Sequence, residues 1–298
     1  MTYRLSSRNP AESRTNSETE NPKIKIFFVF EGAKTEPLYF EEFINIYEKK
    51  AIGEFIILDR LNPSLSNQKS LTEQIETFLN NCENLNESNI NKLKETITAL
   101  KSSSLTPIDL KKLRTELEAH GIPKKTLKII FKKYPNNAML HLTVMETIVT
   151  MNGYNKNYDK VCIIIDRDSG SFSPKQFDEV IKICSLNNFN LGISNPCFEL
   201  YLYLHLNDLS NLDKLKILEN KKDSRNGPTY MEKSLRTFLT QNHNSKFEKN
   251  KFDTSLFLNS FTNIPDNIIS SQVKTDNLEL KTNIGTSVYN MINHLINE

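Results

Sequence analysis

Acidic residues directly follow two short apolar runs that are typical of buried β-strands. Glu31 follows the run 24–30, and Asp166 and Asp168 follow the run 161–165. The ligand crevice of a parallel sheet lies outside the carboxyl ends of its strands, so we expect these carboxylates to meet at one edge. If the strand geometry persists for two more residues, Asp166 and Asp168 also share one face. Converging carboxylates repel one another unless a cation lies among them, and oxygen ligands favour Mg²⁺ or Mn²⁺.

Glu199 indicates a buried charge on independent grounds. The residues after Pro196 are apolar on nearly every face of a helix, and Asn195 is suited to cap that helix, which is therefore predicted to be buried. A carboxylate in its first turn lies largely out of water and needs a partner. Two interpretations stay open. Glu199 caps its own helix end or pairs with a lysine or arginine, or it is a fourth carboxylate at or beside the metal.

Lys34 is a weaker candidate for catalysis. It lies in a loop that opens onto a predicted helix N-terminus, where a lysine can contact a phosphate; the alternative is a solvated loop lysine. The loop has only one of the glycines of a phosphate-binding loop, so ATP binding by this chain is not expected. The sequence contains no G-x-S-x-G motif, so it predicts no covalent serine nucleophile. The cysteines are far apart and lack C-x-x-C spacing, which indicates reduced core thiols at Cys82, Cys162, Cys184 and Cys197.

The elements that must position these residues alternate between strands and helices. Strands are predicted at 24–30, 54–58, 161–165 and 189–193, with helices after Thr35 and at 174–186. This alternation predicts an α/β fold with a mostly parallel sheet flanked by helices. Between the second and third strands the apolar periodicity is helical, and a last amphipathic helix is predicted at 286–296. The intervening helices are predicted at 70–81, 88–100, 107–119, 124–134 and 138–151.

The domain organisation follows from this pattern. Residues 1–22 are polar and without period, which predicts a mobile tail. Residues 23–60 and 138–206 form the sheet core, 61–137 a long helical insertion, and 207–298 a mostly helical C-terminal region. No stretch approaches the roughly 18 to 20 apolar residues of a membrane helix, and the first twenty residues lack the apolar centre of a signal peptide. We therefore expect a cytoplasmic protein without membrane contact.

The net charge of +2, from 38 basic and 36 acidic residues among 298, excludes a polycation or an acidic tail protein. The charge is unevenly distributed. Residues 101–133 hold nine basic and three acidic residues, and 214–251 hold ten and four. Such stretches can follow a phosphate backbone, and a solvated helix face is the alternative for each. The nucleic-acid-binding candidates are Lys111, Lys112, Lys124, Lys125, Lys221 and Lys222.

Four segments together resemble the RloB-like family. They are Phe-Val-Phe-Glu31-Gly-Ala-Lys-Thr-Glu36-Pro-Leu-Tyr-Phe, then Ile-Ile-Ile-Asp166-Arg-Asp168, then the stretch 194–205, then the tail 282–289. The RloB-like proteins are bacterial Toprim-fold proteins associated with abortive infection and anti-phage defence, often encoded beside an ATPase. Two features depart from the family. Ile284 replaces a family-typical proline, and the helical insertion is longer than expected.

The resemblance implies a Toprim sheet, as in topoisomerases, primases and related nucleases. Glu31 would then be a metal ligand or general acid/base, and Asp166 and Asp168 would hold Mg²⁺ or Mn²⁺. Glu199 and Glu36 would serve a second metal, with Asn195 beside them. Metal-activated water would cut RNA, with tRNA as one candidate, or DNA, under the control of a partner ATPase. The chain could also form a homo-oligomer.

Two other functions remain open at this level. The chain could be a non-catalytic sensor or scaffold whose helical insertion binds an ATPase or a phage component. It could also be a phosphatase that forms an aspartyl phosphate, with Asp166 as nucleophile and Asp168 as acid/base. In that fold this strand usually comes first, whereas here it is third.

Overall fold

The computed structural model describes residues 24–47, 53–58, 68–81, 85–102, 110–132, 138–168 and 170–297. Its centre is a five-stranded sheet in the order β2-β1-β3-β4-β5. The first four strands pair in parallel, and the short β5 pairs antiparallel to β4. The predicted α/β fold with a mostly parallel sheet is thereby confirmed. The strands are β1 (Ile24–Phe30), β2 (Gly53–Leu58), β3 (Lys160–Asp166), β4 (Asn190–Asn195) and β5 (Gly285–Thr286).

The central strands are apolar throughout because both faces of the sheet are covered. Successive side chains of β1 point to opposite faces. Phe27 and Val29 enter one hydrophobic core, whereas Ile26, Phe28 and Phe30 enter the other. The sheet therefore separates two cores that are built by different parts of the chain.

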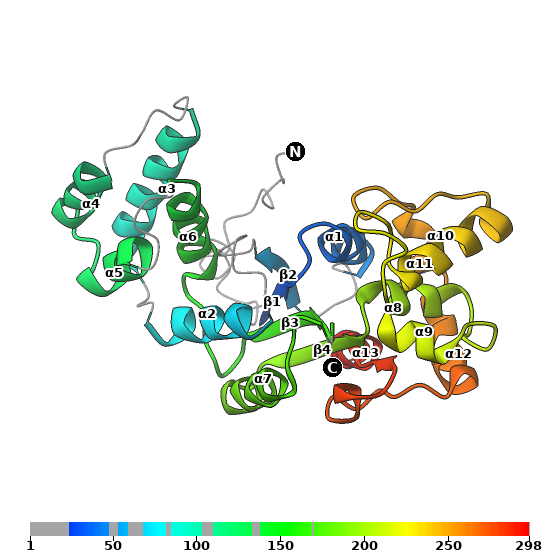
Figure 1. Cartoon of the computed structure of the whole chain (residues 1–298). Coiled ribbons are helices and arrows are strands. Elements are labelled where there is room, and N and C mark those ends of the chain that lie inside the picture. Colours follow the sequence, from blue (N-terminus) through cyan, green and yellow to red (C-terminus); the bar gives the residue numbers. More distant parts are fainter. Residues whose placement is uncertain are drawn as a thin grey trace.

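The first core is built by helices that lie between β2 and β4 in the chain. Helices α2 and α7 pack against each other beside the sheet, and α3, α4 and α5 extend away from it with α6 (Figure 1). We call α3, α4 and α5 the insertion lobe. The helices are α2 (Gln68–Asn81), α3 (Glu87–Ser102), α4 (Leu110–Ala119), α5 (Lys124–Lys132), α6 (Ala138–Met151) and α7 (Pro174–Asn187).

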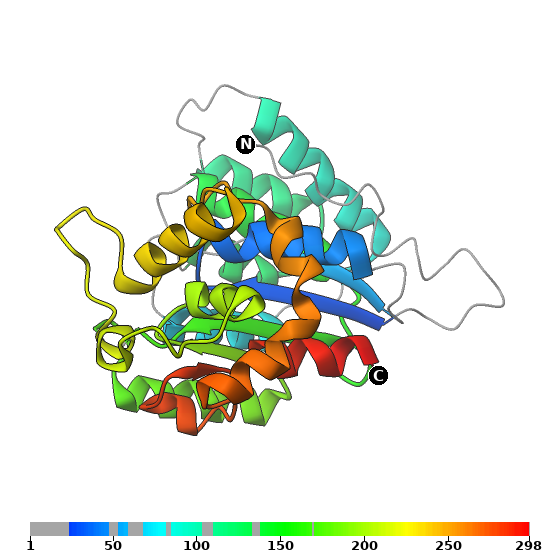
Figure 2. The same ribbon diagram turned by 90° about the vertical axis from the view of Figure 1, so that its right-hand side faces the viewer.

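The second core is built by α1 and the C-terminal region, which cover the opposite face (Figure 2). Its centre is α8, in which all residues from Phe198 to His205 are buried. This confirms the predicted buried helix around Glu199. The helices are α1 (Thr35–Tyr47), α8 (Phe198–Leu206), α9 (Lys214–Glu219), α10 (Tyr230–His243), α11 (Thr254–Asn259), α12 (Ile264–Ser271) and α13 (Val288–Asn297), with 3-10 turns η2 (Phe261–Asn263) and η3 (Glu279–Lys281).

The predicted elements agree with the structure to within a few residues, with one correction at the start of α8. Asn195 does not cap this helix. It is the last residue of β4, opposite Gly285, and Cys197 is the N-cap. The last helix begins at Val288 rather than 286 because Gly285–Thr286 form β5.

Several predictions fall outside the described residues. These are the mobile tail 1–22, the ends 107–109 and 133–134 of two predicted helices, and the state of Cys82. Within the described ranges, Cys162, Cys184 and Cys197 are buried free thiols, as expected. None of the helices in these ranges has the length and apolarity that crossing a membrane requires.

Candidate functional site

Four carboxylates from three parts of the chain meet at the carboxyl ends of β1 and β3. Glu31 follows β1, and its backbone N–H donates to the carbonyl oxygen of Ile164 at 2.9 Å, which places it beside Asp166. Glu36 and Glu199 come from the first turns of α1 and α8. Burial raises the pKa of Asp166 well above its usual value, and the charges of Glu36, Glu31 and Glu199 raise it further. Of the three carboxylates expected to meet at this edge, Glu31 and Asp166 lie side by side, and Glu199 is close enough for its charge to act on Asp166.

Neutral donors hold both oxygens of the Glu31 carboxylate. The backbone N–H of Asp166 donates to Oε2 at 3.0 Å, and the Nε2 of Gln68 donates to Oε1 at 3.0 Å. The same Nε2 donates to the backbone carbonyl of Asp166 at 2.9 Å. Gln68 is the first residue of α2 and is completely buried. Glu31 is thus fixed between the sheet and the insertion.

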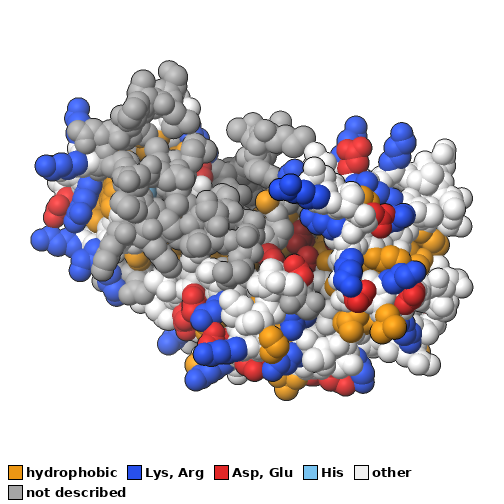
Figure 3. Space-filling model, viewed as in Figure 1, with side chains coloured by type: hydrophobic (Ala, Val, Ile, Leu, Met, Phe, Trp, Pro, Cys, Tyr) orange, Lys and Arg blue, Asp and Glu red, His pale blue; other side chains and the backbone are white. Residues whose placement is uncertain are grey.

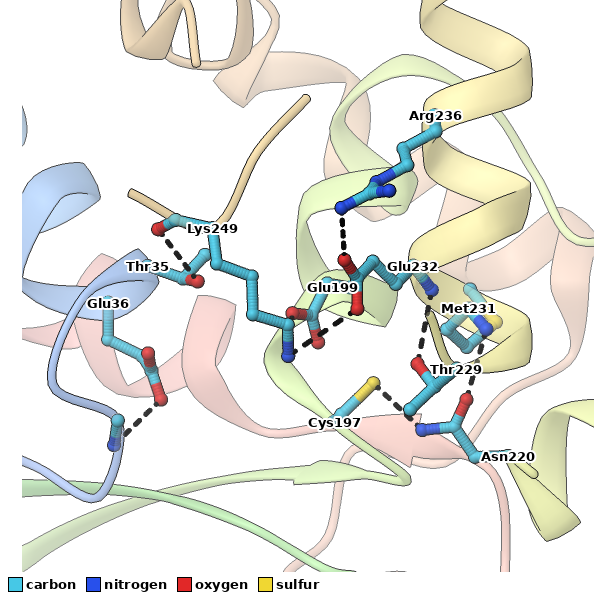
Figure 4. Close-up of polar contacts among 11 residues, drawn as sticks. Thr35, Glu36, Cys197, Glu199, Asn220, Thr229, Met231, Glu232, Arg236 and Lys249 are labelled. Atoms are coloured by element: carbon cyan, nitrogen blue, oxygen red, sulfur yellow. Dashed lines mark hydrogen bonds and ion pairs between the residues drawn. The ribbon is translucent and has the colours of Figure 1, made fainter. Parts of the chain in front are cut away.

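Glu36 lies against the backbone of the loop that follows β1. Its Oε1 accepts a hydrogen bond from the backbone N–H of Gly32 at 3.0 Å (Figure 4). A Cβ at Gly32 would lie only 1.9 Å from Glu36 Oε2, so a residue other than glycine would displace this carboxylate. Burial raises the pKa of Glu36 to about 7, opposed by backbone hydrogen bonds and assisted by the charge of Glu199. Glu36 can therefore exchange a proton near neutral pH.

Glu199 is paired with a lysine that sequence analysis did not single out. Lys249 Nζ lies 2.8 Å from Glu199 Oε1 and 3.9 Å from Glu232 Oε2 (Figure 4). The hydroxyl of Thr35 donates to the backbone carbonyl of Lys249 at 3.2 Å, which ties this segment to α1. Burial lowers the pKa of Lys249, but the charge and hydrogen bond of Glu199 outweigh it, so the pKa is raised. The buried Glu199 thus has the cationic partner that one interpretation required.

Asp168 is not part of this cluster. Its exposed carboxylate accepts hydrogen bonds from the backbone N–H of Gly170 at 2.9 Å and from the hydroxyl of Ser171 at 3.1 Å. The prediction that Asp166 and Asp168 share one face is wrong because β3 ends at Asp166 and Asp168 caps the following turn. Arg167 stabilises that turn from the buried side. Its side chain is buried, and its Nη1 donates a hydrogen bond to the backbone carbonyl of Phe172.

Two further candidates, Lys34 and Asn195, differ from the carboxylates in their surroundings. Lys34 is exposed. Asn195 is buried, and its Nδ2 donates to the carbonyl of Leu280 at 2.9 Å. Asn195 therefore joins β4 to the turn η3, and Lys34 remains a surface lysine near the site.

The donor set suits a hard cation, although its side chains are not arranged as a coordination shell. Within the described part of the chain, no three Asp, Glu, His or Cys side chains are grouped so as to hold a metal ion. Glu31 accepts from protein donors, and Glu199 pairs with Lys249. A buried amide oxygen, Gln68 Oε1, has no hydrogen-bond partner among the described residues. Mg²⁺ or Mn²⁺ would fit these oxygen ligands after Glu36 and Glu199 rotate toward the cation.

The predicted basic residues lie on two separate surfaces. Lys111, Lys112, Lys124 and Lys125 are exposed on α4 and α5, and basic side chains line the outer edge of the insertion lobe in Figure 3. Lys221 and Lys222 are exposed in the connection between α9 and α10. Figure 3 also shows acidic side chains in a recess near the middle of the same face, with basic side chains at its rim. The charge thus changes sign between the recess and its surroundings.

Sequence reasoning missed Gln68 and Lys249. Lys249 lies within the basic stretch 214–251, which was a weak signal for a cation near the acids. For Gln68 the sequence offered no signal, since a polar residue at the start of an amphipathic helix is common. Both residues reach the site only through the tertiary fold.

Comparison with protein families gives a match to the model described as RloB-like protein, over residues 26–295. Comparison with curated proteins and with solved structures gives no match.

Proposed function

The chain belongs to the RloB-like family, and we propose that it is a metal-dependent nuclease of the Toprim type that acts in anti-phage defence. Its substrate would be RNA, including tRNA, or DNA. The observation that carries this proposal is the cluster of Glu31, Glu36, Asp166 and Glu199 at the carboxyl ends of β1 and β3. Such strand ends are where parallel sheets place their ligands.

The residues of the cluster would have different roles in the reaction. Glu31 and Asp166 would hold Mg²⁺ or Mn²⁺, and the ion would lower the pKa of an attacking water and stabilise charge on the phosphate. Glu36, with its pKa of about 7, would take or return a proton at neutral pH. Lys249 would compensate Glu199 and present positive charge to the phosphate from the opposite side. Asp168 is kept as a candidate that could reach the metal only if its turn moves.

The basic surfaces would bring the substrate to this acidic recess. Lys124 and Lys125 on α5, with Lys111 and Lys112 on α4, would contact phosphates away from the cutting point, and Lys221 and Lys222 would do so on the other side. Phosphate contacts of this kind supply affinity without sequence preference. The expected location is the cytoplasm, and the expected regulator is an ATPase encoded nearby.

The test is cleavage by the purified chain with Mn²⁺ or Mg²⁺, with and without the neighbouring ATPase. RNA and DNA of several lengths serve as substrates. Wild type should cut, and Asp166→Asn should abolish cutting. Asp178→Asn is the control, since Asp178 is an exposed aspartate on α7 that pairs with Lys281 at 2.7 Å. Equal protection of cells against phage by wild type and Asp166→Asn would refute the enzymatic interpretation.

One observation favours the sensor or scaffold as a second function. The Glu199–Lys249 ion pair already compensates part of the cluster, as a purely structural site would require. In that case Mn²⁺ should stabilise the fold without any cleavage. The phosphatase gains no support, because Asp168 is directed to its own turn and is not paired with Asp166.

A further inference from the structure

The amide of Gln68 lies where the insertion meets the carboxylate cluster. Its Nε2 uses both hydrogens, one toward Glu31 Oε1 at 3.0 Å and one toward the backbone carbonyl of Asp166 at 2.9 Å. Asp166 in turn donates its backbone N–H to the other oxygen of Glu31. The three residues form a closed hydrogen-bonded set that leaves Glu31 one orientation.

The oxygen of the same amide is unsatisfied. Gln68 has no exposed surface, and its Oε1 has no hydrogen-bond partner in the part of the chain that the structure describes. A buried carbonyl oxygen without a partner costs free energy, and native proteins usually supply a donor or an ordered water. This oxygen is on the amide that holds Glu31. Whatever satisfies it therefore lies beside the carboxylates.

Helix α2 gives Gln68 a rigid base. Leu71, Ile75 and Phe78 are buried in the first core. Lys69 pairs with Glu179 of α7 at 2.7 Å, and Asn187 of α7 donates to Glu76 at 2.9 Å. A side chain on such a helix can hold a carboxylate in one position more accurately than a side chain on a loop.

We propose that Gln68 is the positioning residue through which the insertion sets the geometry of the site. Its Nε2 holds Glu31 in the orientation that receives the divalent cation, and its Oε1 accepts a hydrogen bond from a water molecule in the site. This inference rests on the proposed function. It makes α2 a part of the catalytic unit, so the insertion is more than a docking module.

The test compares Gln68→Met with Gln74→Met. Methionine keeps the length of the side chain and removes its hydrogen bonds. Gln74 is a matched control because it is a buried glutamine six residues further along the same helix. Gln68→Met should weaken Mn²⁺ binding about 10- to 100-fold, measured by titration calorimetry and by the Mn²⁺ electron paramagnetic resonance signal. It should lower kcat by a similar factor and leave KM for the nucleic acid unchanged, whereas Gln74→Met should match wild type in all three.

A second variant covers the case in which Gln68→Met does not fold. Gln68→Asn keeps the amide but is one carbon shorter, so it cannot reach Glu31 and the Asp166 carbonyl together; it should also lose Mn²⁺ affinity. The inference is overturned if the folded variant binds Mn²⁺ as wild type does, if Gln74→Met loses as much, or if wild type does not bind Mn²⁺. Wild type that binds Mn²⁺ but cuts no nucleic acid would refute the proposed function alone, and the Mn²⁺ affinities would still decide the role of Gln68.

Discussion

The two sides of the carboxylate cluster are held in different ways. On the side of the insertion, Glu31 accepts hydrogen bonds from neutral donors, Gln68 and the backbone of Asp166. On the side of the C-terminal region, Glu199 pairs with the charged Lys249. Neutral donors orient a carboxylate and leave its charge in place, whereas an ammonium group compensates the charge directly. The two carboxylates are therefore expected to respond differently when their partners are removed.

Cleavage should fall most when Glu31, which is held by neutral donors, is substituted. Glu31→Gln keeps the size of the side chain, but its amide nitrogen would face either Gln68 Nε2 or the N–H of Asp166, donor against donor. Cleavage should fall about 10²- to 10⁴-fold, the range for loss of a general acid/base group. Single-turnover assays at saturating Mn²⁺ measure this. Glu87→Gln, at the exposed start of α3, is the control. Cleavage by Glu31→Gln within a factor of two of the wild-type rate would show that Glu31 does not take part in the reaction.

The stability of the folded chain should depend on pH through the buried carboxylates of the cluster. Glu36 has a pKa of about 7 in the folded protein and 4.5 as its ordinary value. Between these values the unfolded chain has lost this proton while the folded chain keeps it, so stability falls as pH rises from about 4.5 to about 7. At 1.36 kcal/mol per pKa unit, the loss is at most about 3 kcal/mol. Asp166, whose pKa is also raised, acts in the same direction.

Chemical denaturation in the presence of EDTA at several pH values measures this effect. Glu36→Gln should flatten the slope and leave the contribution of Asp166. Saturating Mn²⁺ should reverse the trend, because a metal binds the deprotonated carboxylates. A wild-type stability that is constant from pH 5 to pH 7 would contradict the clustering of these charges.

Substituting Lys249, the cationic partner of Glu199, should have a smaller effect. Lys249→Met leaves the buried Glu199 without its partner; because the lysine side chain is 46% exposed, the expected loss of unfolding free energy is about 2 kcal/mol. Adding Glu199→Gln to Lys249→Met should recover most of it, which a double-mutant cycle measures. Lys249→Met should also bind Mn²⁺ more tightly, because the metal no longer competes with an ammonium group. Weaker Mn²⁺ binding would mean that Lys249 supports the metal site instead.

The sequence predicts those features of the site that depend only on neighbouring residues in the chain. The apolar runs of β1 and β3 locate Glu31 and Asp166, and the all-apolar helix α8 makes Glu199 a buried charge. The pattern predicts the wrong face for Asp168 because a turn, in which Gly170 N–H donates to the Asp168 carboxylate, replaces the strand after Asp166.

The partners of these carboxylates could not be predicted, because they are distant in the sequence. Gln68 is 37 residues from Glu31, and Lys249 lies 214 residues from Thr35, whose hydroxyl holds its backbone. Periodicity describes which face of an element is buried, but it contains no information on which distant polar group meets that face. The charge balance of the site, and with it the contrast between its two sides, is therefore a property of the tertiary fold.

The smallest expected effect tests whether the insertion also contributes charge to substrate binding. Lys124 and Lys125 are exposed at the start of α5, and removing one lysine that binds a phosphate should lower the salt dependence of binding by about one unit of slope. The double variant Lys124→Ala/Lys125→Ala should therefore reduce the slope by about 2 and raise KM, with kcat unchanged. Lys175→Ala/Lys182→Ala removes two exposed lysines of α7 and is the matched control. If both pairs change the slope equally, the attraction comes from overall charge. If only the α5 pair does, the insertion guides the nucleic acid toward the site.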